Sequence, residues 1–423
     1  MLPTTRKPRR AVVVSLGILV GGWLVLAPRP VALGQGPGPE LDAALRSAQT
    51  LYGQGKFAEA EAAARSALRQ ADDGFGPRHP YSGMARNLLG TILASNAKAR
   101  EALPLLEDAL EIFQNQGGPG LPAAFQTMEN LGRTQLGLED LDGAERTFKR
   151  LRDEAGEGST EQANGFGGLA DVAIRRERPA EAVPLAERAL KIVEAKHPRG
   201  SPEAIRLVIA LAKAYSANRQ HDQVVSLCES TLKAMEARGA GDDPATADLR
   251  GYLGMAATAL TRWELAETQL KRALATATRH YGPNHRQTAA ITNALANYQQ
   301  ARGRPEEARK LLEQAGSEIT PEGGGQAADL PANLINRAGA LINAGRHAQA
   351  ESLLDQALKT LEAQGDGKDP LMAKALNAKA TLYQATGRRP QSVELLERAL
   401  KISEDWNGPD HYDTAMIAYN LGT

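Results

Sequence analysis

A small residue recurs along this chain at an almost constant interval, and that spacing limits the possible folds more than any other feature. The position is held by Ala60, Ala102, Ala144, Ala182, Val224, Ala266, Ala308, Ala350 and Ser392. Every step is 42 residues except the step between Ala144 and Ala182, which is 38. Self-similarity at a fixed period marks a stack of structural repeats, so we expect nine copies of one unit in place of a single enclosed core.

Each unit has the pattern of two amphipathic helices joined by a short turn. In the second unit the first helix is predicted over roughly 84–96 and the second over roughly 100–113. Their apolar positions are Leu89, Gly90 and Leu93 in the first helix and Ala102, Leu106, Ala109 and Leu110 in the second. Each set lies on one face of a helix with 3.6 residues per turn. These faces can be buried only against each other and against the next unit.

Glycine punctuates the units. It stands at or near the end of the first helix at Gly55, Gly137, Gly303, Gly345 and Gly387. A positive φ at these positions would end the helix, and the polar or proline residue that follows would start the next one. Longer loops rich in Gly, Pro, Asp and His join the units at 72–80, 195–202, 239–244, 280–285, 364–370 and 406–411.

The composition suits many small helix contacts and argues against a nucleic-acid partner. Hydrophobic residues make up 42% of the chain and aromatic residues only 4%, which favours Ala/Leu packing over a core built on aromatic anchors. The first 34 residues hold five basic and no acidic residues, so the remainder has 45 basic against 50 acidic residues. Binding to phosphate backbones rests on clustered Lys and Arg, and we therefore expect no nucleic-acid partner.

The N-terminus has the pattern of an export signal. The basic run at 6–10 (RKPRR) precedes seventeen uncharged, mostly apolar residues at 11–27. Ala32, Leu33 and Gly34 place small residues at the spacing that signal peptidase reads, with cleavage before Gln35. A span of this length also fits an uncleaved signal anchor, and both interpretations stay open. In either case we expect the rest of the chain to be exported, periplasmic or extracellular, or tethered by this segment as its one membrane contact.

The unit resembles the tetratricopeptide repeat. The resemblance rests on LG or LA pairs in the first helix, a GKF turn at 55–57 and an EA pair followed by small and leucine residues in the second helix. The period of 42, with GPxHP-type loops, is similar to the longer form found in kinesin light chains and many bacterial proteins. It extends over residues 41–423 and implies an all-α fold, a right-handed α-solenoid of stacked helix-turn-helix pairs. Such motifs specify a fold strongly and an activity hardly at all.

The predicted organisation follows from the repeat count and its irregularities. It comprises a signal peptide or anchor in 1–34, a linker in 35–40, units one to three in 41–158, units four to nine in 159–410, and a partial tenth unit or cap in 411–423. The Gly-rich stretch at 319–330 is interpreted as a looser connection, with a functional insertion as the alternative. The chain ends inside a copy of the first helix, because this stub is the cap or because the sequence is part of a longer protein.

No catalytic, cofactor or metal motif stands at a convincing spacing. The sequence has no GxxxxGK[ST], GxSxG or HExxH pattern and no GxGxxG after a strand. His79, His197, His285 and His411 fall in equivalent inter-unit loops, too far apart in a stack to share one ion. Cys228 occupies a packing position of a second helix and is expected to be a buried, unreactive thiol. We therefore predict a protein without enzymatic activity, cofactor or metal.

A set of asparagines is the candidate binding site. Six of them fall at the two residues just before the LG or LA pair of the first helix, or before its counterpart, and Asn297 lies a turn further on: Asn87, Asn130, Asn293, Asn297, Asn336, Asn377 and Asn420. In the family that the chain resembles, this helix lines the concave face and its asparagines hold an extended peptide by the backbone. An amide donates and accepts at once, which suits such binding. Ordinary polar surface is the alternative interpretation.

The sequence thus predicts a scaffold that binds a peptide segment of a partner protein in the concave groove of a repeat array outside the cytoplasm. The alternative is the targeting region of a longer enzyme, protease-like or kinase, whose catalytic domain is not in this chain. A third option is a cytoplasmic regulator with a later start, but the next methionine after the apolar segment is Met84. That start would remove the whole first unit.

Overall fold

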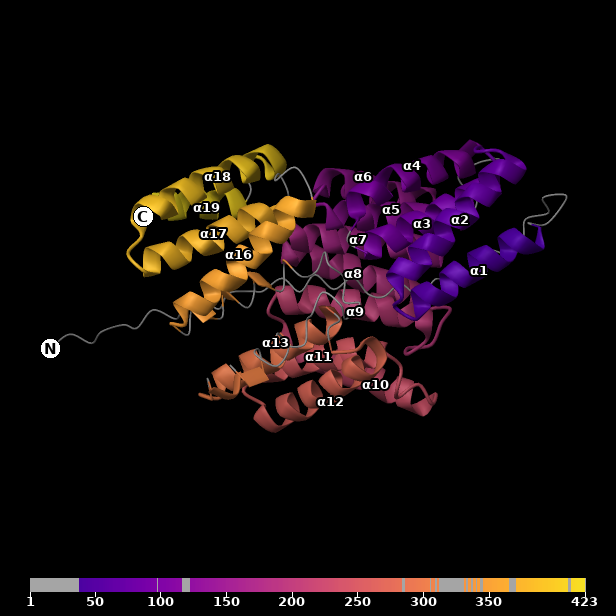
Figure 1. The fold of residues 1–423 in the computed structure, drawn as a ribbon. Coiled ribbons are helices and arrows are strands. Elements are labelled where there is room, and N and C mark those ends of the chain that lie inside the picture. The colour runs from indigo at the N-terminus through magenta and orange to yellow at the C-terminus, as the bar shows by residue number, and fades with distance from the viewer. Residues whose placement is uncertain are drawn as a thin grey trace.

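The chain folds into helices that pack in consecutive pairs (Figure 1). The computed structural model describes residues 38–96, 98–115, 122–283, 286–304, 345–364, 370–409 and 412–422, with a few positions between 306 and 342. No strand occurs among these residues, and the predicted all-α solenoid is confirmed. The helices are α1 (Pro39–Gly53), α2 (Phe57–Phe75), α3 (Pro80–Ser95), α4 (Ala99–Asn115), α5 (Pro122–Gly137), α6 (Leu141–Glu154), α7 (Thr160–Arg175), α8 (Pro179–Glu194), α9 (Pro202–Ala217), α10 (His221–Ala237), α11 (Ala245–Ala259), α12 (Trp263–Tyr281), α13 (Arg286–Ala301), α16 (His347–Gln364), α17 (Pro370–Ala385), α18 (Arg389–Asn407) and α19 (Tyr412–Leu421).

Polar caps and prolines set the helix starts. The hydroxyls of Ser159 and Ser201 accept backbone N–H groups of the first turns of α7 and α9, which would otherwise lack partners. His79 caps α3, where its Nδ1 accepts from the Tyr81 N–H at 3.2 Å. With Pro80 at the first helical position, α3 starts earlier than the predicted residue 84. The sequence pattern followed the apolar face and missed this first turn, which is fixed by the cap.

The recurring small residues form the contact between the two helices of each unit. The nine positions that define the repeat are all buried, with exposed fractions of 0% or 1%. They face a second set of small residues on the first helix of each unit, including Gly90 and Gly254. A Cβ added at Gly90 would lie 3.3 Å from the backbone oxygen of Ala102, and one at Gly254 equally close to that of Ala266. The backbones of the paired helices therefore approach closely at these positions.

In the eight units whose turn the structure describes at this position, one residue has left-handed backbone, five positions before the repeat-defining small residue. It is Gly in several units, for example Gly55 (φ 74°) and Gly387 (φ 76°). The prediction that Gly137 has this role is wrong, because Gly137 is the last residue of α5 and Glu139 has the positive φ of 57°. The next three units place other residues in the same conformation: Glu177 (φ 58°), Arg219 (φ 59°) and Thr261 (φ 57°). The turn geometry is thus kept where the glycine is lost.

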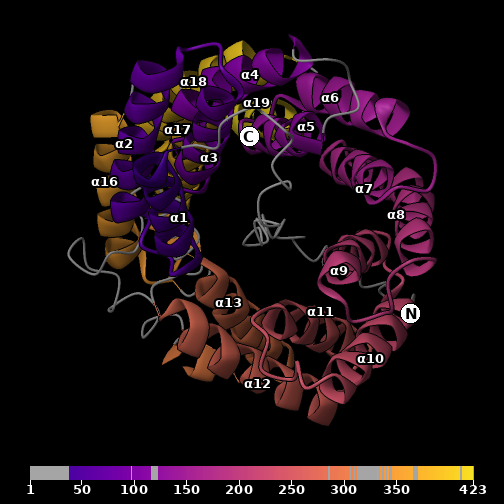
Figure 2. The same ribbon diagram turned by 90° about the vertical axis from the view of Figure 1, so that its right-hand side faces the viewer.

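The array winds into a superhelix with two distinct faces. Viewed end-on, the odd-numbered helices from α3 to α13 lie on the inner side and their even-numbered partners on the outer side (Figure 2). The odd helices also contact one another from unit to unit, as α5 does with α7 and α7 with α9. Because neighbouring inner helices lie closer together than the outer ones, the stack curves. The inner, concave face is therefore built from the first helices of the units.

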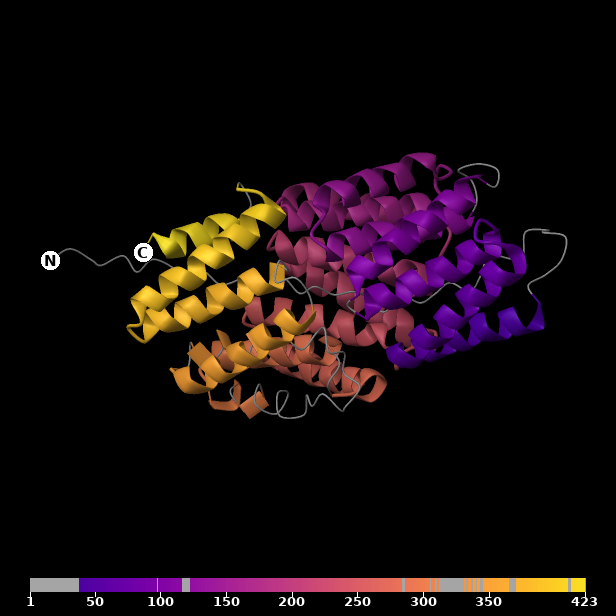
Figure 3. The same ribbon diagram turned by 45° about the horizontal axis from the view of Figure 1, so that its top comes forward.

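The C-terminal helices return to the start of the array. In Figures 1 and 3 the yellow end of the chain lies beside the violet helices of the second and third units. The indole N–H of Trp406 donates to the Leu138 carbonyl at 3.1 Å, and the Arg100 guanidinium lies 4.6 Å from the Trp406 ring centroid. The loop predicted to begin at residue 406 begins later, because α18 continues to Asn407. This contact joins residues one superhelical turn apart.

Several predicted features lie outside the described residues: the N-terminal segment 1–34, the Gly-rich stretch 319–330, and residues 35–37 of the linker predicted over 35–40. The last two residues of that predicted linker belong to α1. Across the described part, no helix combines the length and the apolar character that a membrane crossing requires. The predicted division after residue 158 stays a prediction. Two apolar clusters, one from α1 onward and one up to α11, both include residues of α7, so apolar packing continues on both sides of this helix.

Candidate functional site

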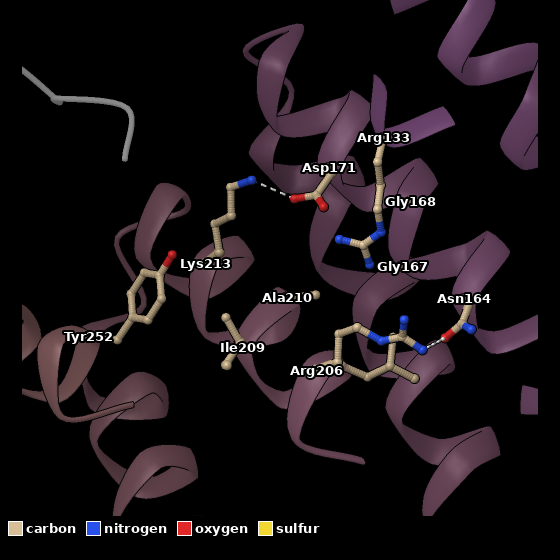
Figure 4. Close-up of a pocket in the computed structure, with 11 residues that line it drawn as sticks. Arg133, Asn164, Gly167, Gly168, Asp171, Arg206, Ile209, Ala210, Lys213 and Tyr252 are labelled. Carbon is tan, nitrogen blue, oxygen red and sulfur yellow. Dashed lines mark hydrogen bonds and ion pairs between the residues drawn. The ribbon is translucent and has the colours of Figure 1, made fainter. Parts of the chain in front are cut away.

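A network of charged and polar side chains crosses the inner face at the centre of the array. It is organised around Glu129 of α5, which is only 8% exposed. Glu129 accepts from Arg133 one turn on in α5, at 3.0 Å, and from the Asn164 amide of α7 at 2.8 Å. Arg206 of α9 pairs with the same carboxylate and donates to the Asn164 oxygen at 3.1 Å. Three consecutive units are thus linked by polar contacts on one face. Figure 4 shows the contact between Arg206 and Asn164.

A second ion pair lies beside this network. The Lys213 ammonium of α9 is 2.5 Å from the Asp171 carboxylate of α7, and the two side chains are 19% and 24% exposed. Figure 4 shows this pair together with Arg133, while the Arg206 guanidinium is directed toward Asn164. The pair links two neighbouring inner helices close to the Glu129 network.

The carboxylates of Glu129 and Asp171 are held in their ionised form. Burial is the largest effect on Glu129 and raises its pKa, but Arg206, Arg133 and the Asn164 amide together outweigh burial, so the pKa lies below its ordinary value. Asp171 follows the same balance, since burial raises its pKa, and Lys213, Arg133 and Arg175 together more than offset that effect. Both acids are therefore charged at neutral pH, and the network is made of ions.

The floor of this region has almost no side chains. Gly167 and Gly168 of α7 and Ala210 of α9 line it, while Ile209 and Tyr252 close one side. The depression encloses about 30 Å³. A cavity needs roughly 10–15 Å³ to admit one water, so this depression, which is open to solvent, has room for about two water-sized groups. It is a notch in the inner face and not a pocket for a whole cofactor.

The predicted asparagines lie in two linked pairs and at separate positions. The Asn130 amide donates to the Asn87 oxygen at 3.0 Å, and the Asn420 amide donates to the Asn377 oxygen at 2.9 Å. On α13, Asn293 is half-buried and Asn297 exposed. Asn336 lies outside the described residues. The first four side chains are partly occupied by one another, so a ligand would compete with these contacts, and their role in binding stays a prediction.

The charged network was not among the predicted residues, although the repeat contains a trace of it. Arg133, Asp171 and Lys213 each stand eleven residues before the small residue that defines the repeat in their own units. Their charges alternate along that column. Aligning the units by this register would have brought the three together, because equivalent positions of adjacent inner helices are neighbours. Glu129 and Arg206 belong to other columns, so only the structure shows their contact.

The histidines and the cysteine considered in the sequence analysis form no metal-binding cluster among the described residues. Within the described residues, no group of three or more His, Cys, Asp or Glu side chains could hold a metal ion. Besides capping α3, His79 stacks on Phe75 with ring centroids 4.9 Å apart, while His285 and His411 lie outside the described residues. Cys228 is fully buried, and this burial raises the pKa of its thiol to about 12. It is a packing residue, as predicted.

Comparison with known proteins identifies the repeat. The family described as Tetratricopeptide repeat matches residues 40–115, 82–153, 129–198, 243–315, 329–405 and 371–423. No protein of curated function matches the sequence.

Solved structures with a similar fold include a Rap protein complexed with Competence and Sporulation Factor, with 14% identity, 90% of this chain and 97% of that chain covered, and a TM-score of 0.47. Aspartyl phosphate phosphatase F from Bacillus subtilis has 13% identity, 91% and 98% coverage, and a TM-score of 0.44. A putative kinesin light chain from Podosopora anserina has 21% identity, 58% and 97% coverage, and a TM-score of 0.33.

Proposed function

Because the chain belongs to the tetratricopeptide repeat family, whose arrays are protein-interaction scaffolds, we propose that its inner face binds an extended segment of a partner protein and that it acts by binding alone. The observation that carries this proposal is the network around Glu129 on α5, α7 and α9. Charged groups placed on a face otherwise packed with Ala and Leu cost desolvation, and they contribute little to stability in return. Donors and acceptors held half-buried on a concave surface are suited to a polypeptide ligand.

The inner face supports an extended ligand through its length as well as its chemistry. Polar side chains recur on it from Asn87 and Asn130 on α3 and α5, through the central network, to Asn293 and Asn297 on α13. A chain in extended conformation advances about 3.3 Å per residue, so successive units can each contact a few residues of one segment. The proposed ligand is therefore a linear segment and not a folded surface.

Site-specific photocrosslinking in cells tests this proposal. A photoreactive amino acid is placed at Asn297 on the inner helix α13, or at Lys233 on the outer helix α10; both positions are exposed. We expect crosslinks from Asn297 to one short segment of one partner, found by mass spectrometry, and none to that segment from Lys233. Equal crosslinking from both positions, or scattered products from Asn297, would contradict the proposal.

We further propose that the array works outside the cytoplasm. Support comes from the basic run at 6–10 followed by the apolar segment 11–27. Sequencing the N-terminus of the protein isolated from cells tests this. A mature chain that begins at Gln35 supports a cleaved signal, and an intact chain that cofractionates with membranes supports an anchor. An intact chain in the soluble cytoplasmic fraction would contradict both forms of the proposal.

A further inference from the structure

One indole connects the two ends of the array. The N–H of Trp406, in the last turn of α18, donates at 3.1 Å to the carbonyl of Leu138, in the turn between α5 and α6. The guanidinium carbon of Arg100, in the first turn of α4, lies 4.6 Å from the ring centroid. Figures 1 and 3 show α18 beside this part of the array. A carbonyl thus binds the polar edge of the indole while a cation lies over its face.

Trp406 and Arg100 both depart from the repeat. Trp406 stands fourteen positions after the repeat-defining small residue, where the other units have polar, charged or glycine residues: Gly74, Gln116, Gly158, Lys196, Arg238, His280, Glu322 and Gln364. Arg100 stands two positions before it, where no other unit is basic: Ala58, Asp142, Ala180, Asp222, Glu264, Glu306, Ala348 and Pro390. A cation in the first turn of a helix opposes the helix dipole. Packing within a unit requires neither residue, but their mutual contact accounts for both.

The contact is small enough to be reversible. The apolar cluster that begins at α1 and the cluster around α17 and α18 share no residue, and Trp406, which is half-buried, belongs to neither. A net hydrogen bond favours the closed arrangement about fivefold, and an exposed cation–π contact about threefold. Together they favour closure about tenfold, so the open arrangement is a populated minor form.

Opening at this contact would change how a partner reaches the inner face. Each unit of a stack packs only on its neighbours, so α18 can move away from α4 while every unit keeps its own packing. The inner face lies inside the superhelical turn (Figure 2). While the turn is closed, a segment can enter along the superhelical axis with its own terminus first. A segment in the middle of a partner chain has to pass between the turns.

We propose that Trp406 is a reversible clasp that holds the array closed over one superhelical turn, and that its opening admits an internal segment of a partner protein to the inner face. The clasp itself stands on the contact of α18 with α4 and the turn after α5. Its role in entry rests on the proposed function. Such a device controls the rate at which the partner enters, as a lid does at an active site.

Distances between spin labels in the full-length protein test the clasp. Cysteines are introduced by Glu107→Cys on α4 and Lys401→Cys on α18, where both positions are exposed. The chain's own Cys228 is fully buried and stays unlabelled. A second pair, Glu107→Cys with Lys233→Cys on α10, does not span the closure and is the reference. Double electron–electron resonance gives the distribution of distances for each pair and counts open and closed forms separately.

Three substitutions are compared in both labelled proteins. Trp406→Phe keeps a ring but removes the N–H donor, and Arg100→Gln removes the cation. Trp263→Phe is the matched control, because that ring lies 5.3 Å from Arg302 and away from the closure. We expect the α4–α18 pair to show a main short distance and a minor long one. The ratio of closed to open should fall about fivefold in Trp406→Phe and about threefold in Arg100→Gln, and stay unchanged in Trp263→Phe.

Two results would overturn the clasp. An α4–α18 distribution that is the same in Trp406→Phe as in the original protein would show that the contact does not hold the turn closed. Broadening of the α4–α10 reference pair to the same extent would show a general loss of structure and no specific opening.

The photoreactive residue at Asn297 tests the role in entry. After induction of the array in cells, brief illumination at increasing times gives the rate at which partner crosslinks appear. We expect this rate to rise about three- to fourfold in Trp406→Phe, in proportion to the open fraction, and to stay unchanged in Trp263→Phe. Equal rates despite a shift in the label distances would overturn the role in entry. Absence of crosslinks in every variant would contradict the proposed function and remove that role with it, while the label distances still decide the clasp.

Discussion

An alanine at Gly168 should destabilise the array, although alanine normally strengthens a helix. The ring of Phe148 on α6 is 1% exposed and lies between two glycines, Gly132 of α5 and Gly168 of α7. A Cβ at Gly168 would lie 2.2 Å from Cδ1 of that ring, and a Cβ at Gly132 would lie 2.7 Å from Cζ. The ring is therefore confined on both sides, and it cannot move away from a methyl group at Gly168 without meeting α5.

The expected magnitude follows from two opposing terms. Gly→Ala in a helix interior gains about 1 kcal/mol, and overpacking a buried contact costs about 1–3 kcal/mol. A separation as short as 2.2 Å places the cost near the upper end, so Gly168→Ala should lower the free energy of unfolding by about 2 kcal/mol. Phe148→Ala alone should cost about 3–5 kcal/mol through its cavity. With the ring removed, Gly168→Ala should instead gain about 1 kcal/mol, which gives a coupling of about 3 kcal/mol.

Hydrogen exchange measured by mass spectrometry is the assay, because a repeat array opens locally and a single global midpoint is poorly defined. Peptides from α6 and α7 should exchange about thirtyfold faster in Gly168→Ala, the factor that corresponds to about 2 kcal/mol. The matched control is Gly251→Ala in α11, where the added Cβ would meet only Ile291 at 3.8 Å and should slow exchange. If both alanine variants behave alike, or if Gly168→Ala costs the same with and without the Phe148 ring, the confinement argument is wrong.

Three further predictions concern the turn, the buried acid and the contact across the superhelical turn. Thr261→Gly should raise the free energy of unfolding, measured by urea denaturation, by about 1 kcal/mol, because the exposed threonine has φ of 57°. Gly387→Ala, at φ 76° in the equivalent turn, should lower that free energy by at least as much. Equal effects of the two changes would contradict this prediction. The pKa of Glu129 in the folded protein lies below its ordinary value of 4.5, so ionised Glu129 stabilises the fold fully above pH 4.5, and this stabilisation is lost as the pH falls through the folded-state pKa. Hydrogen exchange in α5 and α9 should therefore become faster in this acidic range, and the increase should be smaller in Glu129→Gln. Trp406→Ala removes the contact with Leu138 and should increase the radius of gyration in X-ray scattering, and an unchanged radius would show that the contact does not hold the ends together.

The repeat period predicted the architecture because it depends on one physical requirement met nine times. Every unit needs a small residue where its helices cross, so positions such as Ala102 and Ala266 recur whatever the surface does. Local details followed weaker rules. The start of α3 at Pro80 depends on one histidine cap, and the left-handed residue at Glu139 is glycine in other units. A pattern that looks for glycine therefore finds Gly137 and misses the residue that turns the chain.

Only those residues of the candidate site that recur at equivalent positions of the repeat could be predicted from the sequence. Most of the asparagines were found because they stand at two adjacent positions of the repeat, but the pairing of Asn130 with Asn87 depends on how the two side chains orient. The central network departs from the repeat further, since Glu129 meets Arg206 from a different column two units away. Side chains that recur in every unit cannot determine where along the groove a ligand binds. A ligand that contacts the whole groove would therefore be recognised by the side chains that differ between units. The residues that break the repeat on the inner face are therefore the ones expected to set specificity, and Tyr252, which replaces the small or asparagine residue found there in most other units, is the clearest of them.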